Sequence, residues 1–114
     1  MPFRNQVQLI TYPDSLGGDL QALDEVLSGP LSGLFGGVHL LPFYPSSADR
    51  GFSPITYREV DPAFGTWDDV RRLGARFDLL ADLMVNHISR RSPYFVDFAR
   101  HGRASAYADM FITL

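Results

Sequence analysis

Apolar residues along the chain gather in three short runs, which cover residues 7–12, 37–43 and 79–85. The stretches between and after these runs are more polar, and their apolar residues recur every three or four positions, as Leu23 and Leu27 do. Short apolar runs are typical of buried strands, whereas the wider spacing is typical of amphipathic helices. The pattern predicts strand, helix, strand, helix, strand, helix, and therefore a parallel sheet with right-handed crossovers.

Capping residues predict where the first two helices begin and end. Asp19 is the expected N-cap of the first helix, which Gly29 and the proline after it terminate. Thr66-Trp67-Asp68-Asp69 resembles a capping box with Asp in place of the usual Glu. The helical stripe that follows this box runs to Phe77.

The last part of the sequence predicts a third helix and then an open end. The helix is expected over residues 93–100, with Phe95 and Phe98 on one side. Residues 110–114 form an apolar run without a terminating signal, which indicates that the fold continues beyond them.

The predicted fold class is α/β, the N-terminal three β/α units of an incomplete (β/α)₈ barrel. A complete barrel needs about 250 residues and a flavodoxin-like sheet about five strands, whereas this chain has 114 residues. Three parallel strands alone would leave two open edges and an uncovered inner face. We therefore expect the isolated chain to be poorly soluble or molten.

Composition indicates a soluble globular protein. Apolar residues make up 46% and charged residues 20%, and the net charge of −3 gives no reason to expect nucleic acid or a membrane as partner. Cysteine is absent, and no signal peptide or long apolar segment is present, which suits the cytoplasm. No phosphate loop, nucleophile elbow or paired metal-ligand spacing occurs, so no cofactor and no metal are expected.

The long loop from residue 42 to residue 66 carries the first candidate site. In parallel α/β folds, ligands bind at the carboxyl ends of the strands, and this loop follows the second strand. Asp49, beside the flexible Gly51, could accept hydrogen bonds from two vicinal sugar hydroxyls, and Phe52 could lie against a pyranose ring. Alternatively, Asp49 pairs with Arg50 or caps a turn, and Phe52 fills the core.

The second candidate cluster is Asn86-His87, at the predicted end of the third strand. His87 could bind a sugar hydroxyl, or it could be structural, as His39 is expected to be. Asp82 lies inside the same apolar run and needs a partner if it is buried. It either supports the site from behind or forms a structural ion pair inside the barrel, and no arginine here is an obvious partner. That partner is expected outside this chain.

Asp82-Leu83-Met84-Val85-Asn86-His87 resembles the first signature region of the α-amylase superfamily. Other segments resemble the sucrose phosphorylases of that superfamily, and together they cover essentially the whole chain. They are residues 5–12, 37–43, 51–55, 65–69 and 110–114.

Within that family, residues 12–18, 49–52 and 87–92 look closest to sucrose 6-phosphate phosphorylases. Plain sucrose phosphorylases tend to have Asp at the position of Ser53, so Ser53 and Arg50 favour a phosphorylated sucrose as donor. Glucosylglycerate phosphorylases are a third candidate.

The resemblance implies a (β/α)₈ barrel with a small domain inserted after the third strand. Residues 1–106 would belong to the catalytic barrel, and residues 107–114 would begin the inserted domain. The family reaction is retaining and reversible: an Asp nucleophile displaces fructose or its phosphate ester, a Glu serves as acid and then base, and a second Asp steadies the sugar. Inorganic phosphate then takes the glucosyl group, which gives α-glucose 1-phosphate. All three carboxylates would lie beyond Leu114, so no catalytic residue is expected in this chain.

By position, the resemblance implies that Asp49 holds the glucosyl ring, that Phe52 is its aromatic platform and that His87 binds its outer hydroxyls. Asn86 matches a position that helps to bind calcium in many α-amylases, but sucrose phosphorylases are not typically calcium enzymes. A hydrolase or transglucosylase of the same superfamily, or an inert sugar-binding or protein-binding α/β module, are the alternatives.

Overall fold

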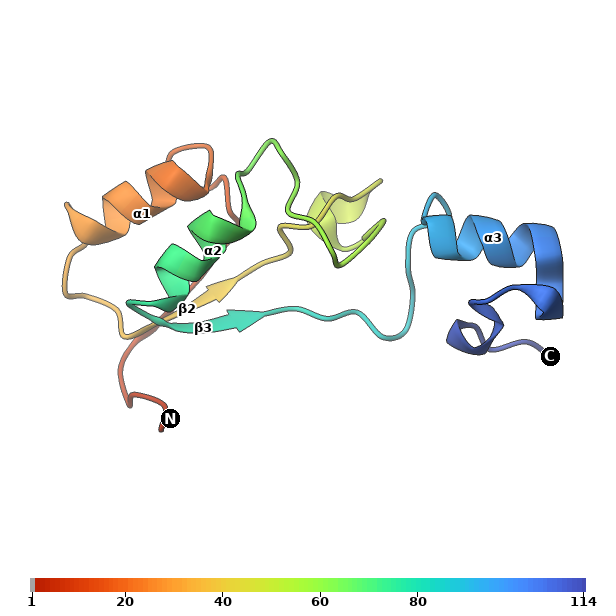
Figure 1. Ribbon diagram of the computed structural model, residues 1–114. Helices are drawn as coiled ribbons and strands as arrows, with labels where there is room; N and C mark the ends of the chain where they lie inside the picture. The colour runs from red at the N-terminus through yellow and green to blue at the C-terminus, as the bar shows by residue number, and fades with distance from the viewer. Residues whose placement is uncertain (1) are drawn as a thin grey trace.

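The computed structural model describes residues 2–114 and contains three strands and three α-helices within them (Figure 1). In chain order these are β1 (Gln8–Thr11), α1 (Leu20–Ser28), β2 (Gly37–Leu40), α2 (Trp67–Gly74), β3 (Asp78–Ala81) and α3 (Pro93–His101). Short 3₁₀ turns occupy Asp49–Gly51, Gly102–Ala104 and Ala108–Met110. The alternation that the sequence predicts is confirmed.

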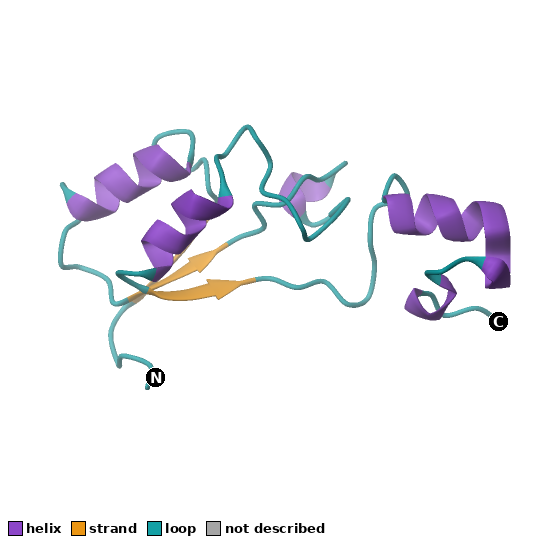
Figure 2. Ribbon diagram, viewed as in Figure 1, coloured by secondary structure: helices purple, strands orange, loops and turns teal. Residues whose placement is uncertain are grey.

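The three strands form one parallel sheet in the order β1-β2-β3. Leu9, Val38 and Leu79 lie side by side in register across it. Helices α1 and α2 lie on the same face of this sheet (Figure 2). The sheet is therefore covered on one face and left open on the other by the described residues.

The core lies between the central strand and the two helices. Its fully buried members are Leu20 and Leu23 of α1, Val38 and Leu40 of β2, and Leu73 of α2. The open face is different: Ile10 in β1 is 62% exposed, although it is apolar.

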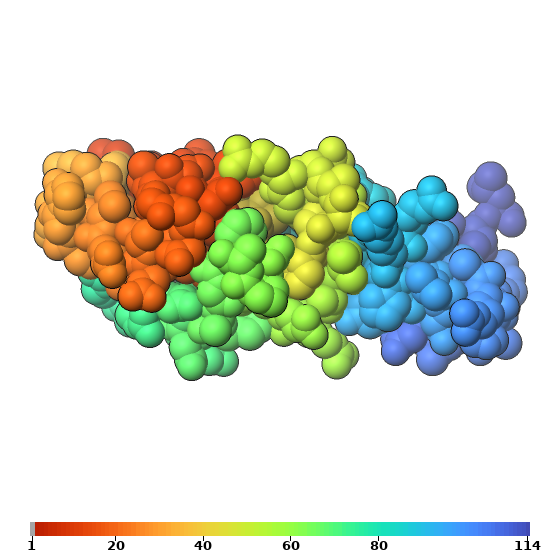
Figure 3. All heavy atoms as spheres, turned by 90° about the horizontal axis from the view of Figure 1, so that it is seen from above, coloured from red at the N-terminus to blue at the C-terminus, as the bar shows by residue number. Residues whose placement is uncertain are grey.

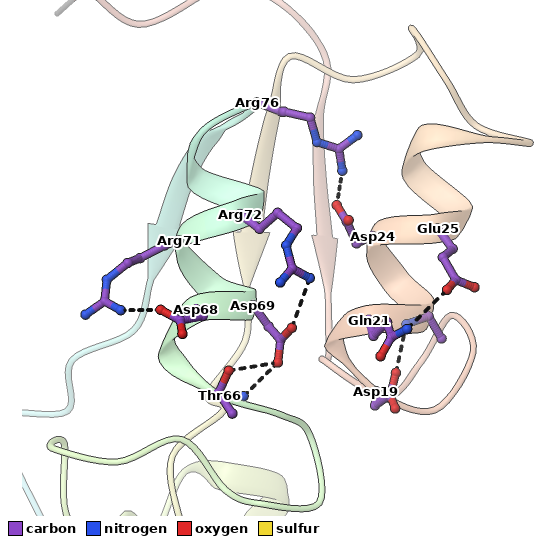
Figure 4. A network of polar contacts seen from close by, with 11 residues as sticks. Asp19, Gln21, Asp24, Glu25, Thr66, Asp68, Asp69, Arg71, Arg72 and Arg76 are labelled. Carbon is purple, nitrogen blue, oxygen red and sulfur yellow. Dashed lines mark hydrogen bonds and ion pairs between the residues drawn. The ribbon is translucent and has the colours of Figure 1, made fainter.

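Both predicted helix caps are present (Figure 4). The Asp19 carboxylate accepts a hydrogen bond from the Ala22 amide at 2.7 Å, which satisfies one free N–H of α1. The Asp69 carboxylate accepts from the Thr66 amide at 2.8 Å and from the Thr66 hydroxyl at 3.1 Å. Asp therefore fills the role that Glu has in the usual capping box.

Two elements end earlier than the apolar runs predict. Strand β2 stops at Leu40, because Pro42 has no N–H to donate to a ladder. Strand β3, whose Ala81 pairs with Leu40, then loses its neighbour and ends at Ala81 rather than at residue 85. Val85, the last residue of the run, is 88% exposed. The prediction of a strand over residues 79–85 is therefore wrong in its second half.

Helix α2 also ends at Gly74, before Phe77. Its basic residues pair with acids: Arg71 with Asp68 at 2.7 Å, and Arg76, just after the helix, with Asp24 of α1 (Figure 4). These arginines form a solvated face and a contact between the two helices.

The described chain is elongated, with extents of 52 × 30 × 22 Å (Figure 3). Its radius of gyration is 16.7 Å, against about 13 Å for a compact domain of this length. Helix α3 lies beyond the end of the sheet, and the Phe95 and Phe98 rings both contact the Phe111 ring, at 5.6 and 4.8 Å. None of the helices described is long and apolar enough to cross a membrane.

Candidate functional site

The loop over residues 46–54 folds back on itself beyond the end of β2. Ser46 and Pro54 form an isolated antiparallel bridge across its base. The Ser46 hydroxyl donates to the Ser53 carbonyl oxygen at 2.9 Å and lies 3.2 Å from the Ser53 amide, which donates to it. The predicted long loop is thus ordered by its own hydrogen bonds.

The tip of this loop has an unusual backbone. Asp49, Arg50 and Gly51 have φ angles of 57°, 48° and 98° in succession. A side chain at Gly51 would place its Cβ 2.6 Å from the Pro42 carbonyl oxygen, so only glycine fits there. The prediction that Gly51 permits a sharp turn is confirmed.

Asp49 is left free by this geometry. Among residues 2–114, no hydrogen bond or ion pair engages its carboxylate. Arg50 pairs instead with Asp14, at 3.0 Å between Nη2 and Oδ1, and its guanidinium lies 4.0 Å from the centre of the Tyr12 ring. The alternative in which Asp49 pairs with Arg50 is therefore wrong. Phe52 is half-buried and lies outside the main core cluster.

A cavity of about 270 Å³ opens at the carboxyl ends of β1 and β2. Its lining includes Tyr12, Asp14, Tyr44, Asp49, Arg50 and Asp61. Such a volume suits one small polar molecule, and the charged groups on its wall suit a ligand with several hydroxyl groups.

His87 lies beside the loop tip and is held by two hydrogen bonds. Its Nε2 is 2.6 Å from the Phe52 carbonyl oxygen, which can only accept, so Nε2 carries the hydrogen. Its Nδ1 therefore accepts from the Asn86 side-chain amide at 3.0 Å. A sugar hydroxyl that binds His87 must replace one of these partners.

The structure brings Asp49, Phe52 and His87 into one region but not into one cavity. Asp49 lines the cavity of about 270 Å³, whereas His87 and Asn86 line a second, largely apolar hollow of about 630 Å³. Leu83, Val85 and the ring of Phe98 line that hollow as well. Within residues 2–114 no group of three or more His, Cys, Asp or Glu side chains is placed to hold a metal ion.

Two serines that the sequence reasoning missed fasten the loop to the segment of His87. The hydroxyls of Ser47 and Ser89 lie 2.6 Å apart, and Ser89 is only 2% exposed. The Ser89 amide also donates to the Pro54 carbonyl oxygen at 2.9 Å. In the sequence, the only trace of this link is Ser46-Ser47 before Asp49 and Ser89 after His87. Serine is too common in loops for these residues to predict it.

Asp82 has a partner in this chain, contrary to the expectation that it lies elsewhere. Its Oδ2 lies 3.0 Å from Nε2 of His39, and both side chains are about a quarter exposed, at 26% and 27%. His39 is in register with Leu80, and side chains two residues apart in an extended segment share a face, so Asp82 reaches the same side as His39.

Two tyrosines, also missed, hold the extended segment after β3. The Tyr57 hydroxyl donates to the Met84 carbonyl oxygen at 2.9 Å and accepts from the Met84 amide at 2.8 Å. The Tyr44 ring packs edge-on against it, with 4.8 Å between centres. Burial raises the pKa of Tyr44, with smaller increases from Tyr57 and Asp82, and burial likewise raises the pKa of Tyr57. Both hydroxyls therefore remain donors at neutral pH.

The family described as "Alpha amylase, catalytic domain" matches residues 12–114. The chain belongs to this family. Its three-stranded parallel sheet with helices is consistent with an incomplete part of that α/β catalytic domain.

Curated relatives identify the branch that the chain resembles. It is 63% identical to the sucrose 6(F)-phosphate phosphorylase of Thermoanaerobacterium thermosaccharolyticum over 114 residues, which are 100% of this chain and 23% of that protein. It is 54% identical over 112 residues to the sucrose phosphorylase of Streptococcus mutans and to the glucosylglycerol phosphorylase of Marinobacter adhaerens, covering 98% of this chain and 23% of each. The predicted resemblance to sucrose phosphorylases is confirmed.

A solved structure agrees with these relatives. The crystal structure of sucrose 6F-phosphate phosphorylase from Thermoanaerobacter thermosaccharolyticum superposes with a TM-score of 0.93 and 63% identity, over 99% of this chain and 23% of that one. The chain thus spans about a quarter of the length of the proteins that it matches.

Proposed function

We propose that this chain is the N-terminal part of a glycoside phosphorylase, comprising the first three β/α units of its barrel. The enzyme transfers a glucosyl group from sucrose 6-phosphate or sucrose to inorganic phosphate and releases α-glucose 1-phosphate. The observation that carries the proposal is the 63% identity, over the full chain, to a sucrose 6(F)-phosphate phosphorylase.

The chain would supply one wall of the pocket for the glucosyl ring. Asp49 carries this role best, because its carboxylate has no partner among residues 2–114 and lines the cavity of about 270 Å³. A carboxylate can accept hydrogen bonds from two neighbouring hydroxyls at once, and such bonds to a charged group are stronger than neutral ones. Phe52 would offer its ring to the sugar, and His87 would bind an outer hydroxyl.

Other residues would keep that wall in place. The Asn86 amide fixes the ring of His87 through Nδ1, at 3.0 Å. The Asp82 carboxylate is paired with His39, and in a closed barrel it would face the interior. Residues 107–114 would begin the domain inserted after the third strand.

The chemical steps would use carboxylates outside this chain. An Asp would attack the anomeric carbon while a Glu protonates the departing fructose oxygen, and phosphate would then displace the Asp while the same Glu accepts a proton. No step would require a metal or a cofactor. Within this chain the work would be binding and orientation of the glucosyl group.

We place sucrose 6-phosphate first among the donors. The identity is 63% to the enzyme for the phosphorylated donor and 54% to the enzyme named for sucrose itself. The 54% identity to a glucosylglycerol phosphorylase makes glucosylglycerol a further candidate donor. Glucosylglycerate, which the sequence suggests, is another.

A chimera tests the proposal. In it, this chain replaces the matching segment of the Thermoanaerobacterium thermosaccharolyticum phosphorylase, which is 63% identical over the same length. The expected result is phosphate-dependent release of α-glucose 1-phosphate from sucrose 6-phosphate. A folded chimera that releases no glucose 1-phosphate from any of the donors named above would overturn the proposal, and one that releases free glucose instead would favour a hydrolase.

A further inference from the structure

Arg50, at the edge of the proposed sugar pocket, makes two contacts with the segment that follows β1. Its guanidinium lies 4.0 Å from the centre of the Tyr12 ring, and Nη2 lies 3.0 Å from Oδ1 of Asp14. Tyr12 and Asp14 follow β1, whereas Arg50 belongs to the loop that follows β2. The side chain therefore spans the carboxyl ends of two neighbouring strands.

The backbone of Arg50 needs such an anchor. Asp49 and Arg50 both have left-handed φ angles, 57° and 48°, which residues with a Cβ rarely adopt. Strained backbone persists only where surrounding contacts hold it. Inside the loop, the Phe52 amide bonds to the Asp49 carbonyl oxygen at 3.1 Å, and the contacts of Arg50 with Tyr12 and Asp14 tie the tip to the rest of the molecule.

The guanidinium of Arg50 makes two contacts within this chain. One face of its guanidinium is covered by Tyr12, and one edge is paired with Asp14. The side chain is otherwise 61% exposed and keeps its remaining N–H groups free, so a role at a donor phosphate is one route to the reaction, which a comparison of two donors separates. The other route runs through its neighbour in sequence, the free carboxylate of Asp49.

We propose that Arg50 is a positioning residue, which holds Asp49 in the orientation that binds the glucosyl ring. This inference rests on the proposed function. Arg50 stacks on Tyr12 and pairs with Asp14, and these two contacts fix the peptide between residues 49 and 50 in its left-handed conformation. Loss of the side chain would let this peptide rotate and turn the Asp49 carboxylate away from the sugar.

The chemistry of the stack favours arginine over lysine. A planar guanidinium can lie flat on an aromatic ring and still donate to a carboxylate in its own plane. An ammonium group can keep the ion pair but not the flat contact. Arg50→Lys should therefore retain part of the effect, and Arg50→Ala none of it.

The experiment measures kcat and KM of the chimera for two glucosyl donors, sucrose 6-phosphate in the forward direction and α-glucose 1-phosphate in reverse. Both donors present the same glucosyl group, whereas their phosphate groups lie at different places, on the fructosyl C6 of sucrose 6-phosphate and on the glucosyl C1 of glucose 1-phosphate. Arg50→Ala should lower kcat/KM about 10- to 100-fold for both, mainly through kcat, because a misplaced contact weakens transition-state binding. Arg50→Lys should lose about 3- to 10-fold, and the control Arg71→Ala, on the solvated face of α2, should change neither value.

A double variant shows whether the effect passes through Asp49. If it does, Arg50→Ala added to Asp49→Asn should cost no further activity, because the two side chains act as a unit. Additive losses would overturn the proposal, as would a loss confined to sucrose 6-phosphate, which would make Arg50 a ligand of the donor phosphate. Activity of Arg50→Ala within twofold of the parent would also overturn it.

The failure of this inference can be told apart from that of the proposed function. If the parent chimera is active and Arg50→Ala has the same activity, the glycoside phosphorylase proposal is supported and the role of Arg50 is wrong. An inactive but folded parent would remove both. If a thermal melt shows that Arg50→Ala is not folded, the two donors are compared with Arg50→Lys instead.

Discussion

His39 and Asp82 lie 3.0 Å apart, Nε2 to Oδ2, and His39 is in register with the exposed Ile10 on the open face of the sheet. His39 comes from β2, and Asp82 follows β3 directly. In a closed barrel that face would be the interior, where an unpaired polar group is costly. The pair therefore allows a carboxylate and an imidazole to sit among apolar barrel residues.

Removal of either partner should destabilise the chimera. Asp82→Ala or His39→Ala leaves the other group without its hydrogen bond, at a cost of about 1–3 kcal/mol. Each variant should lower the thermal midpoint by a few degrees, and the double variant should lower it by less than the sum. Additive losses would show that the two side chains do not depend on each other in the whole protein. Asp109→Ala, at an exposed position, is the control.

Gly51→Ala should disrupt the candidate site while the sheet remains folded. The Cβ of the new alanine would lie 2.6 Å from the Pro42 carbonyl oxygen. The alanine would also have to adopt a φ of +98°. The loop tip must then move, and we expect kcat/KM of the chimera to fall about 10-fold or more.

Gly33→Ala is the matched control for that substitution. Gly33 has a φ of +77°, but a Cβ there meets nothing within 4 Å. Because Ala is strained at a positive φ, this substitution should cost about 1–2 kcal/mol of stability, and it should leave activity unchanged. Equal losses of activity in the two variants would mean that backbone strain alone, rather than the contact with Pro42, explains the effect.

Tyr44, which is buried, and Tyr57, which is half-buried, predict a loss of stability at high pH. Burial raises the pKa of Tyr44 and Tyr57 above the ordinary value of 10.0. The folded protein thus holds these protons more tightly than the unfolded chain does. Their contribution to stability is full below pH 10 and disappears as the pH rises through the raised folded values.

Tyr44→Phe tests this dependence in the chimera. Between about pH 9 and pH 11 its thermal midpoint should fall less steeply than that of the parent, because one of the responsible hydroxyls is gone. Tyr107→Phe, at an exposed ring, should follow the parent. Identical slopes for Tyr44→Phe and the parent would contradict the prediction.

The isolated 114-residue chain should not behave as a compact folded domain. Val85 is 88% exposed, Ile10 is 62% exposed, and the hollow of about 630 Å³ beside α3 is lined mostly by apolar side chains. Exposed apolar surface and an open strand edge favour association. We expect poor solubility or a broad thermal transition, and a sharp melt with dispersed amide resonances would contradict this expectation.

The order of elements and their caps could be predicted from sequence because they depend on local signals. Asp and Thr are common N-cap residues, so Asp19 and Thr66 before amphipathic stretches predict helix starts. The three apolar runs have the length of strands. The early end of β3 could not be predicted from its own apolar run, because it depends on Pro42, which follows the neighbouring strand β2. The composition of β3 does not show that β2, its hydrogen-bonding partner, ends at Leu40.

The candidate site was predictable in its position but not in its contacts. The loop after β2 was expected to carry Asp49, and the structure places this residue at a cavity. The partner of Asp82 was missed, although the register of β2 and β3 would have pointed to His39. The engagement of Arg50 by Tyr12 and Asp14 joins segments 36 residues apart in sequence, and no local pattern indicates it.

Asp49 would be the residue through which this chain supplies the glucosyl-binding wall of a phosphorylase. The most direct measurement is phosphate-dependent release of α-glucose 1-phosphate by the chimera and by its Asp49→Ala variant. Loss of one charge-assisted contact that tightens in the transition state costs about 2–4 kcal/mol, which corresponds to a fall of about 30- to 1,000-fold in kcat/KM. This loss should occur with an unchanged thermal midpoint. An Asp49→Ala chimera that releases glucose 1-phosphate at nearly the parent rate would contradict it.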